Sequence, residues 1–79
     1  MSFPVGSNVE VLIGNLWCAG LVEEVPADGC YWVDLDNPPT LAEVGKTHKY
    51  VDSSSLFNKR VFVTEAPNNF PGEEIIRSQ

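Results

Sequence analysis

The residues best suited to chemistry in this chain are two tryptophans and a set of nearby carboxylates. Trp17 and Trp32 lie in the stretch WCAGLVEEVPADGCYWVDLD, residues 17 to 36, which contains no lysine and no arginine. An exposed indole flanked by carboxylates attracts cations through cation–π attraction and ion pairing. The stretch therefore predicts a surface that binds a cationic ligand. Trp17 and Trp32 would supply its aromatic faces, and its charge would come from Glu23, Asp34 and Asp36.

Other kinds of chemistry find little support in the sequence. His48 stands near Asp52 and three serines, but no oxyanion-hole motif accompanies them, so we expect no catalytic triad. Cys18 and Cys30 lack the close-paired spacing of zinc ligands, and they do not face each other in the expected hairpin. We expect two free thiols that pack as small apolar groups. No phosphate loop, dinucleotide fingerprint or calcium loop occurs, so the sequence predicts no enzyme, no metal and no cofactor.

Charge is distributed unevenly along the 79 residues, whose net charge is −6. Residues 1–45 carry seven carboxylates and no basic residue, and all five lysines and arginines lie in residues 46–77. Such an acidic half attracts a cationic partner and repels nucleic acid, whose binding rests on Lys and Arg contacts. The segments KTHK and NKR are the one patch that could oppose this expectation.

The N-terminal sequence has neither the basic nor the apolar region of a secretory signal. No apolar run approaches the ~20 residues of a membrane span. We therefore expect a soluble, intracellular protein that does not contact a membrane.

The elements that position the tryptophans are expected to be short strands, because apolar residues recur with a period of two. Val9, Val11 and Ile13 would share one face of a first strand. A second strand over 16–25 would place Trp17 and Glu23 on one face, so that the neighbouring Glu23 and Glu24 diverge. Gly20 within it predicts a bulge or a sharp bend.

A third strand over 30–36 alternates cleanly, with Tyr31, Val33 and Leu35 on one face. The other face would carry Trp32, Asp34 and Asp36. Asn-Pro-Pro-Thr ends this strand, because two prolines cannot join a ladder of hydrogen bonds. Residues 37–47 would then form the longest loop of the domain, and long loops often carry function.

Two more strands are expected, THKYV over 47–51 and KRVFVTE over 59–65, with a capped turn at DSSSLF between them. Residues 66–79 would be a tail, either flexible or docked through Phe70, Ile75 and Ile76, with one helical turn at GEEIIR. Five short strands joined by tight turns predict an all-β fold, a single strongly bent barrel over residues 1–65. A β-sandwich is the alternative.

The segment VGSNVEVLIGNLWCAGLVEEVPADGCYWVDLD resembles the first three strands of Tudor-type SH3-like barrels, and the resemblance extends over about residues 5–63. The resemblance implies recognition of methylated lysine or arginine in an aromatic cage. Trp17 matches one cage aromatic. The cage positions after the third strand fall on Asp36, Asn37 and Pro38, so Tyr50 or Phe57 would have to complete the cage.

These observations lead to the expectation of a non-enzymatic interaction module for a cationic peptide or protein segment, methylated or unmodified. The alternative is a small oligomeric barrel, such as the product of a mobile element, with a ligand or catalytic site between subunits. In size the chain is similar to the small plasmid-borne dihydrofolate reductases, which build one site from several subunits. Their Val-Gln-Ile-Tyr segment is absent here.

Overall fold

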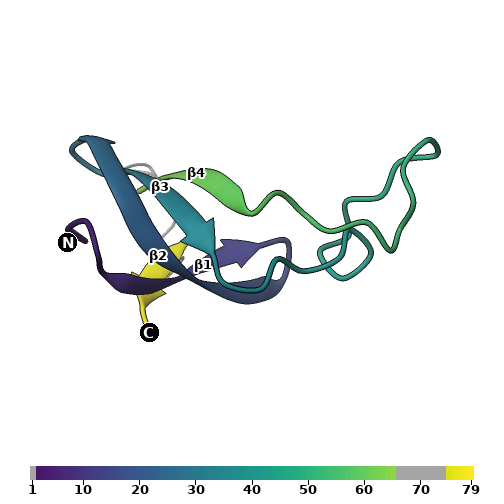
Figure 1. The fold of residues 1–79 in the computed structure, drawn as a ribbon, viewed down its shortest axis with the longest axis horizontal. Helices are drawn as coiled ribbons and strands as arrows, with labels where there is room; N and C mark the ends of the chain where they lie inside the picture. The colour runs from purple at the N-terminus through teal and green to yellow at the C-terminus, as the bar shows by residue number, and fades with distance from the viewer. Residues whose placement is uncertain (1, 66–74) are drawn as a thin grey trace.

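The computed structural model describes residues 2–65 and 75–79, and these form one antiparallel sheet (Figure 1). The strands are β1 (Asn8–Ile13), β2 (Leu16–Ala27), β3 (Cys30–Leu35), β4 (Arg60–Thr64) and β5 (Ile76–Ser78). Their order in the sheet is β4-β3-β2-β1-β5. The expectation of an all-β fold of five strands is confirmed. Among the residues that the structure describes, no helix is long and apolar enough to cross a membrane.

The core lies on the inner face of the sheet. The apolar residues that recur with a period of two in the sequence form most of it. Val9, Val11 and Ile13 of β1 are buried. The fully buried residues with the largest side chains are Tyr31, Leu35, Val9, Val22 and Val33. Burial of such side chains is the main favourable term in folding, so these residues hold β1, β2 and β3 together.

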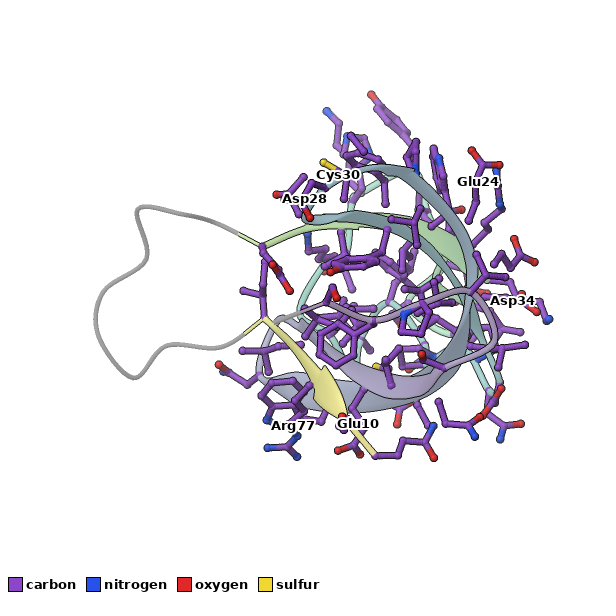
Figure 2. All side chains as sticks on the ribbon, turned by 90° about the vertical axis from the view of Figure 1, so that its left-hand side faces the viewer. Glu10, Glu24, Asp28, Cys30, Asp34 and Arg77 are labelled. Carbon is purple, nitrogen blue, oxygen red and sulfur yellow. The ribbon has the colours of Figure 1, made fainter. Side chains whose placement is uncertain are left out.

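The sheet curls around this core without closing (Figure 2). β4 pairs only with β3 and β5 pairs only with β1, so these two strands form its edges. The described strands therefore make an open, strongly curved sheet.

Gly20 marks the place where β2 passes closest to β3. A Cβ atom at this position would lie 2.7 Å from Cγ1 of Val33 and 2.8 Å from the carbonyl oxygen of Asp34. The bulge predicted at Gly20 lies farther along the strand, because the β2–β3 register shifts between Val22 and Glu24 and again between Glu24 and Ala27. Glycine is needed at position 20 for close approach, while the bend follows it.

The set of five strands differs from the expected set at two places. Residues 47–51 do not form a strand; they lie in turns joined by one isolated bridge between His48 and Val51. The last strand is instead Ile76–Ser78, which pairs with Val9–Val11. The helical turn expected at GEEIIR is wrong for residues 76–77, which are in β5, while residues 72–74 and Phe70 lie outside the described residues. Ile76 is buried in the core, as docking of the tail would require.

The connection between β3 and β4 is longer than the expected 37–47 loop and extends away from the sheet (Figure 1). Its base is a turn over residues 40–46, closed at both ends. At its start, the amide of Thr40 donates to Oε1 of Glu43 (2.9 Å), and the amide of Glu43 donates back to Oγ1 of Thr40 (3.2 Å). At its end, Gly45 has φ 73° and the amide of Lys46 donates to the carbonyl of Leu41 (2.9 Å). These are the bonds of a capping box and a helix C-terminal cap.

This turn is fixed to the sheet through Val44, which is 5% exposed. The backbone of Val44 lies directly over Gly14, in the tight turn between β1 and β2. A second turn, at DSSSLF, forms as predicted: the amide of Ser54 donates to Oδ1 of Asp52 (3.0 Å). The base of the long connection is thus a rigid extension of the sheet.

Candidate functional site

Trp32 and Phe62 form an aromatic pair on the outer face of β3 and β4. The two residues are register partners, and their ring centroids lie 5.0 Å apart at an interplanar angle of 61°. Phe62 is 50% exposed and Trp32 is half-buried. Edge-to-face pairs of this kind contribute about 0.5–1.5 kcal/mol beyond area burial. The pair therefore provides a firm, partly exposed aromatic surface.

Arg60 covers the Trp32 ring of this aromatic pair. Its guanidinium carbon lies 4.3 Å from the centroid of the Trp32 ring. Its Nε donates to Oε2 of Glu23 at 2.8 Å, and its Nη2 lies 3.8 Å from Oε1 of Glu24. The expectation that Glu23 and Glu24 diverge is wrong, because the register shift between Val22 and Glu24 turns both carboxylates toward one guanidinium.

Asp34 borders the same surface and binds Lys59. Nζ of Lys59 donates to both carboxylate oxygens of Asp34, at 2.8 and 3.0 Å. This hydrogen bonding to Asp34 raises the pKa of Lys59. We call the whole surface the Trp32 face; it consists of Glu23, Glu24, Trp32, Asp34, Lys59, Arg60 and Phe62.

Trp17 lies on a different part of the sheet, beside β1 and β5. The guanidinium carbon of Arg77 lies 3.7 Å from the centroid of its ring, and Nε of Arg77 donates to Oε1 of Glu10 at 2.9 Å. Figure 2 shows Glu10 and Arg77 together, well apart from Glu24 and Asp34. Trp32 pairs with Glu24, and a strand rises about 3.3 Å per residue, so Trp17 lies roughly 20–25 Å along β2 from the Trp32 face. The two indoles cannot share one cage.

The remaining predicted site residues lie on the long connection between β3 and β4. Asp36 and Asn37 begin the long connection, where the amide of Asp36 donates to the carbonyl of Ala19 at 3.0 Å. Tyr50 is 80% exposed near the far end of the connection, and its ring lies 4.8 Å from Nζ of Lys49. Of the predicted set, the structure brings together Trp32, Asp34 and Glu23.

Four members of the Trp32 face were not predicted as site residues from the sequence, namely Glu24, Lys59, Arg60 and Phe62. Phe62 and Arg60 lie on β4, a strand that the sequence predicts. The sequence does not indicate that this strand lies beside β3. Glu24 joins through the register shift. The alternation of KRVFVTE was the available signal, because it puts Arg60 and Phe62 on the face opposite Val61 and Val63.

The cysteines and the other titratable groups do not assemble into a second site in the described ranges. Cys18 is buried and Cys30 is half-buried, and both thiols are free, as expected. Burial raises the pKa of the Cys18 thiol. Among residues 2–65 and 75–79, no three His, Cys, Asp or Glu side chains are grouped so that they could hold a metal ion.

The chain was compared with known proteins at three levels. No protein-family model, no characterised protein and no solved structure matches it. The assignment of a function therefore rests on the geometry of the Trp32 face.

Proposed function

We propose that this chain is a non-enzymatic interaction module that binds a cationic segment of a partner protein on the Trp32 face. The observation that carries the proposal is Arg60, whose guanidinium stacks on Trp32 and pairs with Glu23. The surface is already complementary to a guanidinium, since it presents an aromatic ring beneath and carboxylates beside it. A partner's arginine or lysine would take the place that Arg60 occupies.

The contact of Arg60 with Glu23 and Trp32 is weak enough for the arginine or lysine of a partner to replace it. The side chains of Arg60 and Glu23 are 48% and 38% exposed, and ion pairs between such groups contribute about 0.2–1 kcal/mol. An exposed cation–π contact adds about 0.5–1 kcal/mol before the entropy of ordering the arginine is subtracted. A net internal preference of about 1 kcal/mol leaves roughly one molecule in six with the site open. The net charge of −6 attracts the cationic segment.

An SH3-like barrel of the Tudor type is part of this proposal. It is supported by the strand order β4-β3-β2-β1-β5 and by the long, bent β2, which contacts both β1 and β3. The cage of such barrels would not use Trp17, which lies far along β2 under Arg77. Trp32 and Phe62 would form the aromatic walls for a methylated or an unmodified cation.

Binding of an arginine-containing peptide, measured by amide NMR titration, tests the proposal. The peptide is compared with versions in which the arginine is lysine, methyl-lysine, methyl-arginine or glutamine. The variant Arg60→Gln removes the internal competitor, and Lys49→Gln is its matched control, since it changes the net charge equally at a residue of the long connection that is outside the Trp32 face. We expect Arg60→Gln to bind about sixfold more tightly than Lys49→Gln, because an internal preference of about 1 kcal/mol leaves the site open in roughly one molecule in six.

Two results would contradict the proposal. One is equal affinity of Arg60→Gln and Lys49→Gln, which would mean that the stacked guanidinium does not occupy the binding site. The other is equal affinity for the arginine and glutamine peptides, which would mean that the surface does not select a cation.

The open edges of the sheet favour a second candidate function. Among the described strands, β4 and β5 each pair on one side only, and exposed edges pair readily with other strands. Chains joined through these edges would form an oligomer with a ligand or catalytic site between subunits. Sedimentation distinguishes the candidates, because the interaction module is a monomer and the second candidate is a stable assembly.

A further inference from the structure

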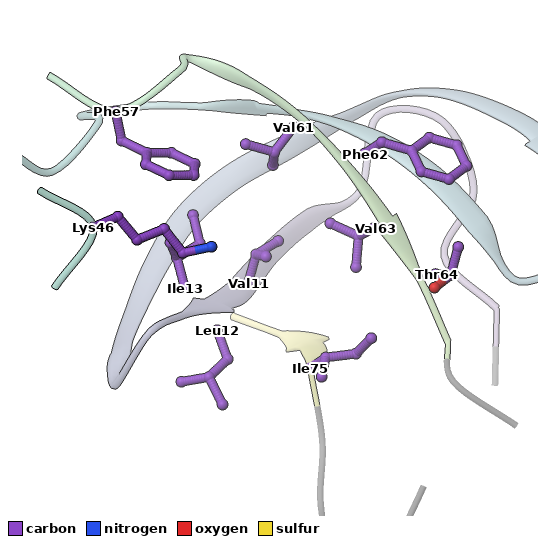
Figure 3. A pocket seen from close by; sticks show the side chains of 10 residues that line it. All are labelled: Val11, Leu12, Ile13, Lys46, Phe57, Val61, Phe62, Val63, Thr64 and Ile75. Atoms are coloured by element: carbon purple, nitrogen blue, oxygen red, sulfur yellow. The ribbon is translucent and has the colours of Figure 1, made fainter. Parts of the chain in front are cut away.

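A groove of about 290 Å³ runs along the open side of the curled sheet (Figure 3). We call it the seam groove, because it lies between β1 and β4, which are not paired with each other. Its walls are apolar side chains from both strands and from the long connection, chiefly Val11, Ile13, Phe57, Val61 and Val63. These side chains leave a hydrophobic cleft continuous with the core.

Lys46 is the single charged residue among those that line the groove. Figure 3 shows its side chain reaching across the groove beside Phe57 and Ile13. Its Nζ lies 5.9 Å from the centroid of the Phe57 ring. Within the described part of the chain, Lys59, Arg60 and Arg77 each pair with a carboxylate, whereas Lys46 forms no ion pair. The ammonium group of Lys46 thus lies beside the apolar walls of the groove, near the ring of Phe57.

The position of Lys46 is set by the fold. It ends the turn over residues 40–46, which the bonds between Thr40 and Glu43 close at one end and the Lys46 amide closes at the other. Val44, two residues earlier, anchors this turn against the sheet. The turn therefore fixes the backbone from which the Lys46 side chain reaches the groove, and a fixed backbone loses less entropy on binding an anion than a free loop would.

We infer that the seam groove binds a small apolar molecule that carries one carboxylate, with its hydrocarbon part between β1 and β4 and its carboxylate on Lys46. The volume of about 290 Å³ is at the lower end of ligand sites, and at ~30 Å³ for each water-sized atom it holds roughly ten heavy atoms. A straight-chain acid of about that length fits. The valine, isoleucine and phenylalanine side chains of the walls have no polar atoms, so the hydrocarbon part of the ligand needs no hydrogen-bonding groups. Phe62 borders both the groove and the Trp32 face, but the other six residues of that face do not line the groove, so the inference does not depend on the proposed function.

Titration of the full chain with decanoate tests the inference, with methyl NMR signals of Val11, Ile13, Val61 and Val63 as the readout. Decanol serves as the neutral probe and decyltrimethylammonium as the cationic one. We expect saturable decanoate binding that shifts these methyl signals, and weaker binding of the other two probes. Lys46→Met keeps an apolar side chain and should weaken decanoate about fivefold while leaving decanol unchanged.

Lys49→Met is the matched control, because it removes the same charge from the same connection without lining the groove. Its decanoate affinity should equal that of the unmodified chain. The inference is overturned by an equal loss in both variants, which indicates non-specific charge attraction. It is also overturned by equal binding of decanol and decanoate, or by decanoate shifts confined to residues outside the groove.

Discussion

Substitution of Gly20 by alanine tests directly whether β2 and β3 approach each other closely at this position. The added Cβ would lie 2.7 Å from Cγ1 of Val33 and 2.8 Å from the carbonyl oxygen of Asp34. Carbon atoms prefer separations of about 3.5–4.0 Å, so β2 and β3 would have to move apart by roughly 1 Å. Val33 is fully buried and cannot turn away freely. Overpacking of this kind costs about 1–3 kcal/mol, and the lower entropy of the unfolded alanine chain returns about 0.5–1 kcal/mol.

One of the two close atoms is a backbone oxygen that cannot turn away, so the cost lies near the upper end, at ~3 kcal/mol, and the net expectation for Gly20→Ala is a loss of about 2 kcal/mol in the free energy of unfolding. For a domain of this size that corresponds to a Tm lower by roughly 8–16 °C. Urea unfolding followed by tryptophan fluorescence measures the change, with an unchanged m value showing that the transition stays two-state.

Gly45→Ala is the matched control. Gly45 has φ 73° and no heavy atom within 4 Å of a Cβ built on it, so the substitution adds backbone strain without a clash. Its net loss should be below about 1.5 kcal/mol. If Gly20→Ala proves as stable as Gly45→Ala, β2 and β3 do not approach each other as closely at Gly20 as described above.

Three further predictions concern buried groups. Tyr31→Phe should lower stability by about 1–2 kcal/mol in chemical denaturation, because the Tyr31 hydroxyl donates to Oε1 of Glu65 (3.1 Å) and accepts from the amide of Phe3 (3.4 Å). Burial raises the pKa of Tyr31 above its ordinary value of 10.0, so its contribution to stability is complete below pH 10 and is lost as pH rises through the higher folded pKa. The Tyr31→Phe variant should therefore lose less stability than the unmodified chain over that alkaline range. A thiol reagent should modify Cys30 faster than Cys18 in the folded chain, and denaturant should equalise the two rates, as mass spectrometry of the labelled peptides would show.

The faces of the strands could be predicted from the sequence because alternation is a local property. The alternating residues of β1 and β3 lie on the faces assigned to them, with Val9 and Tyr31 inside and Trp32 outside. β5 could not be predicted in the same way, since three residues, Ile76–Ser78, are too few to show a period. Their pairing with Val9–Val11 depends on a partner more than sixty positions earlier in the chain.

The kinds of residue in the candidate site, aromatic and acidic, could be predicted from the sequence. Their positions relative to one another could be predicted only in part. Trp32 and Asp34 share a face because they are two residues apart on one strand. The arginines that cover Trp32 and Trp17 come from β4 and β5, and no local pattern states which strand will lie beside which. Arg60 reaches both Glu23 and Glu24 because the register of β2 shifts between Val22 and Glu24, and a single extra residue in a strand leaves no clear signal in the sequence.

The pairing of β1 with β5 also constrains the order of events during biosynthesis. Val11 pairs with Ile76, so β1 cannot gain this neighbour until residues 12–76 have been translated. At about 5–20 residues per second, one side of β1 stays unpaired on the ribosome for roughly 3–13 s. Open strand edges are the sites at which nascent chains join one another. Glu10, at the centre of this edge, supplies a charge that discourages such contacts until Arg77 arrives to neutralise it.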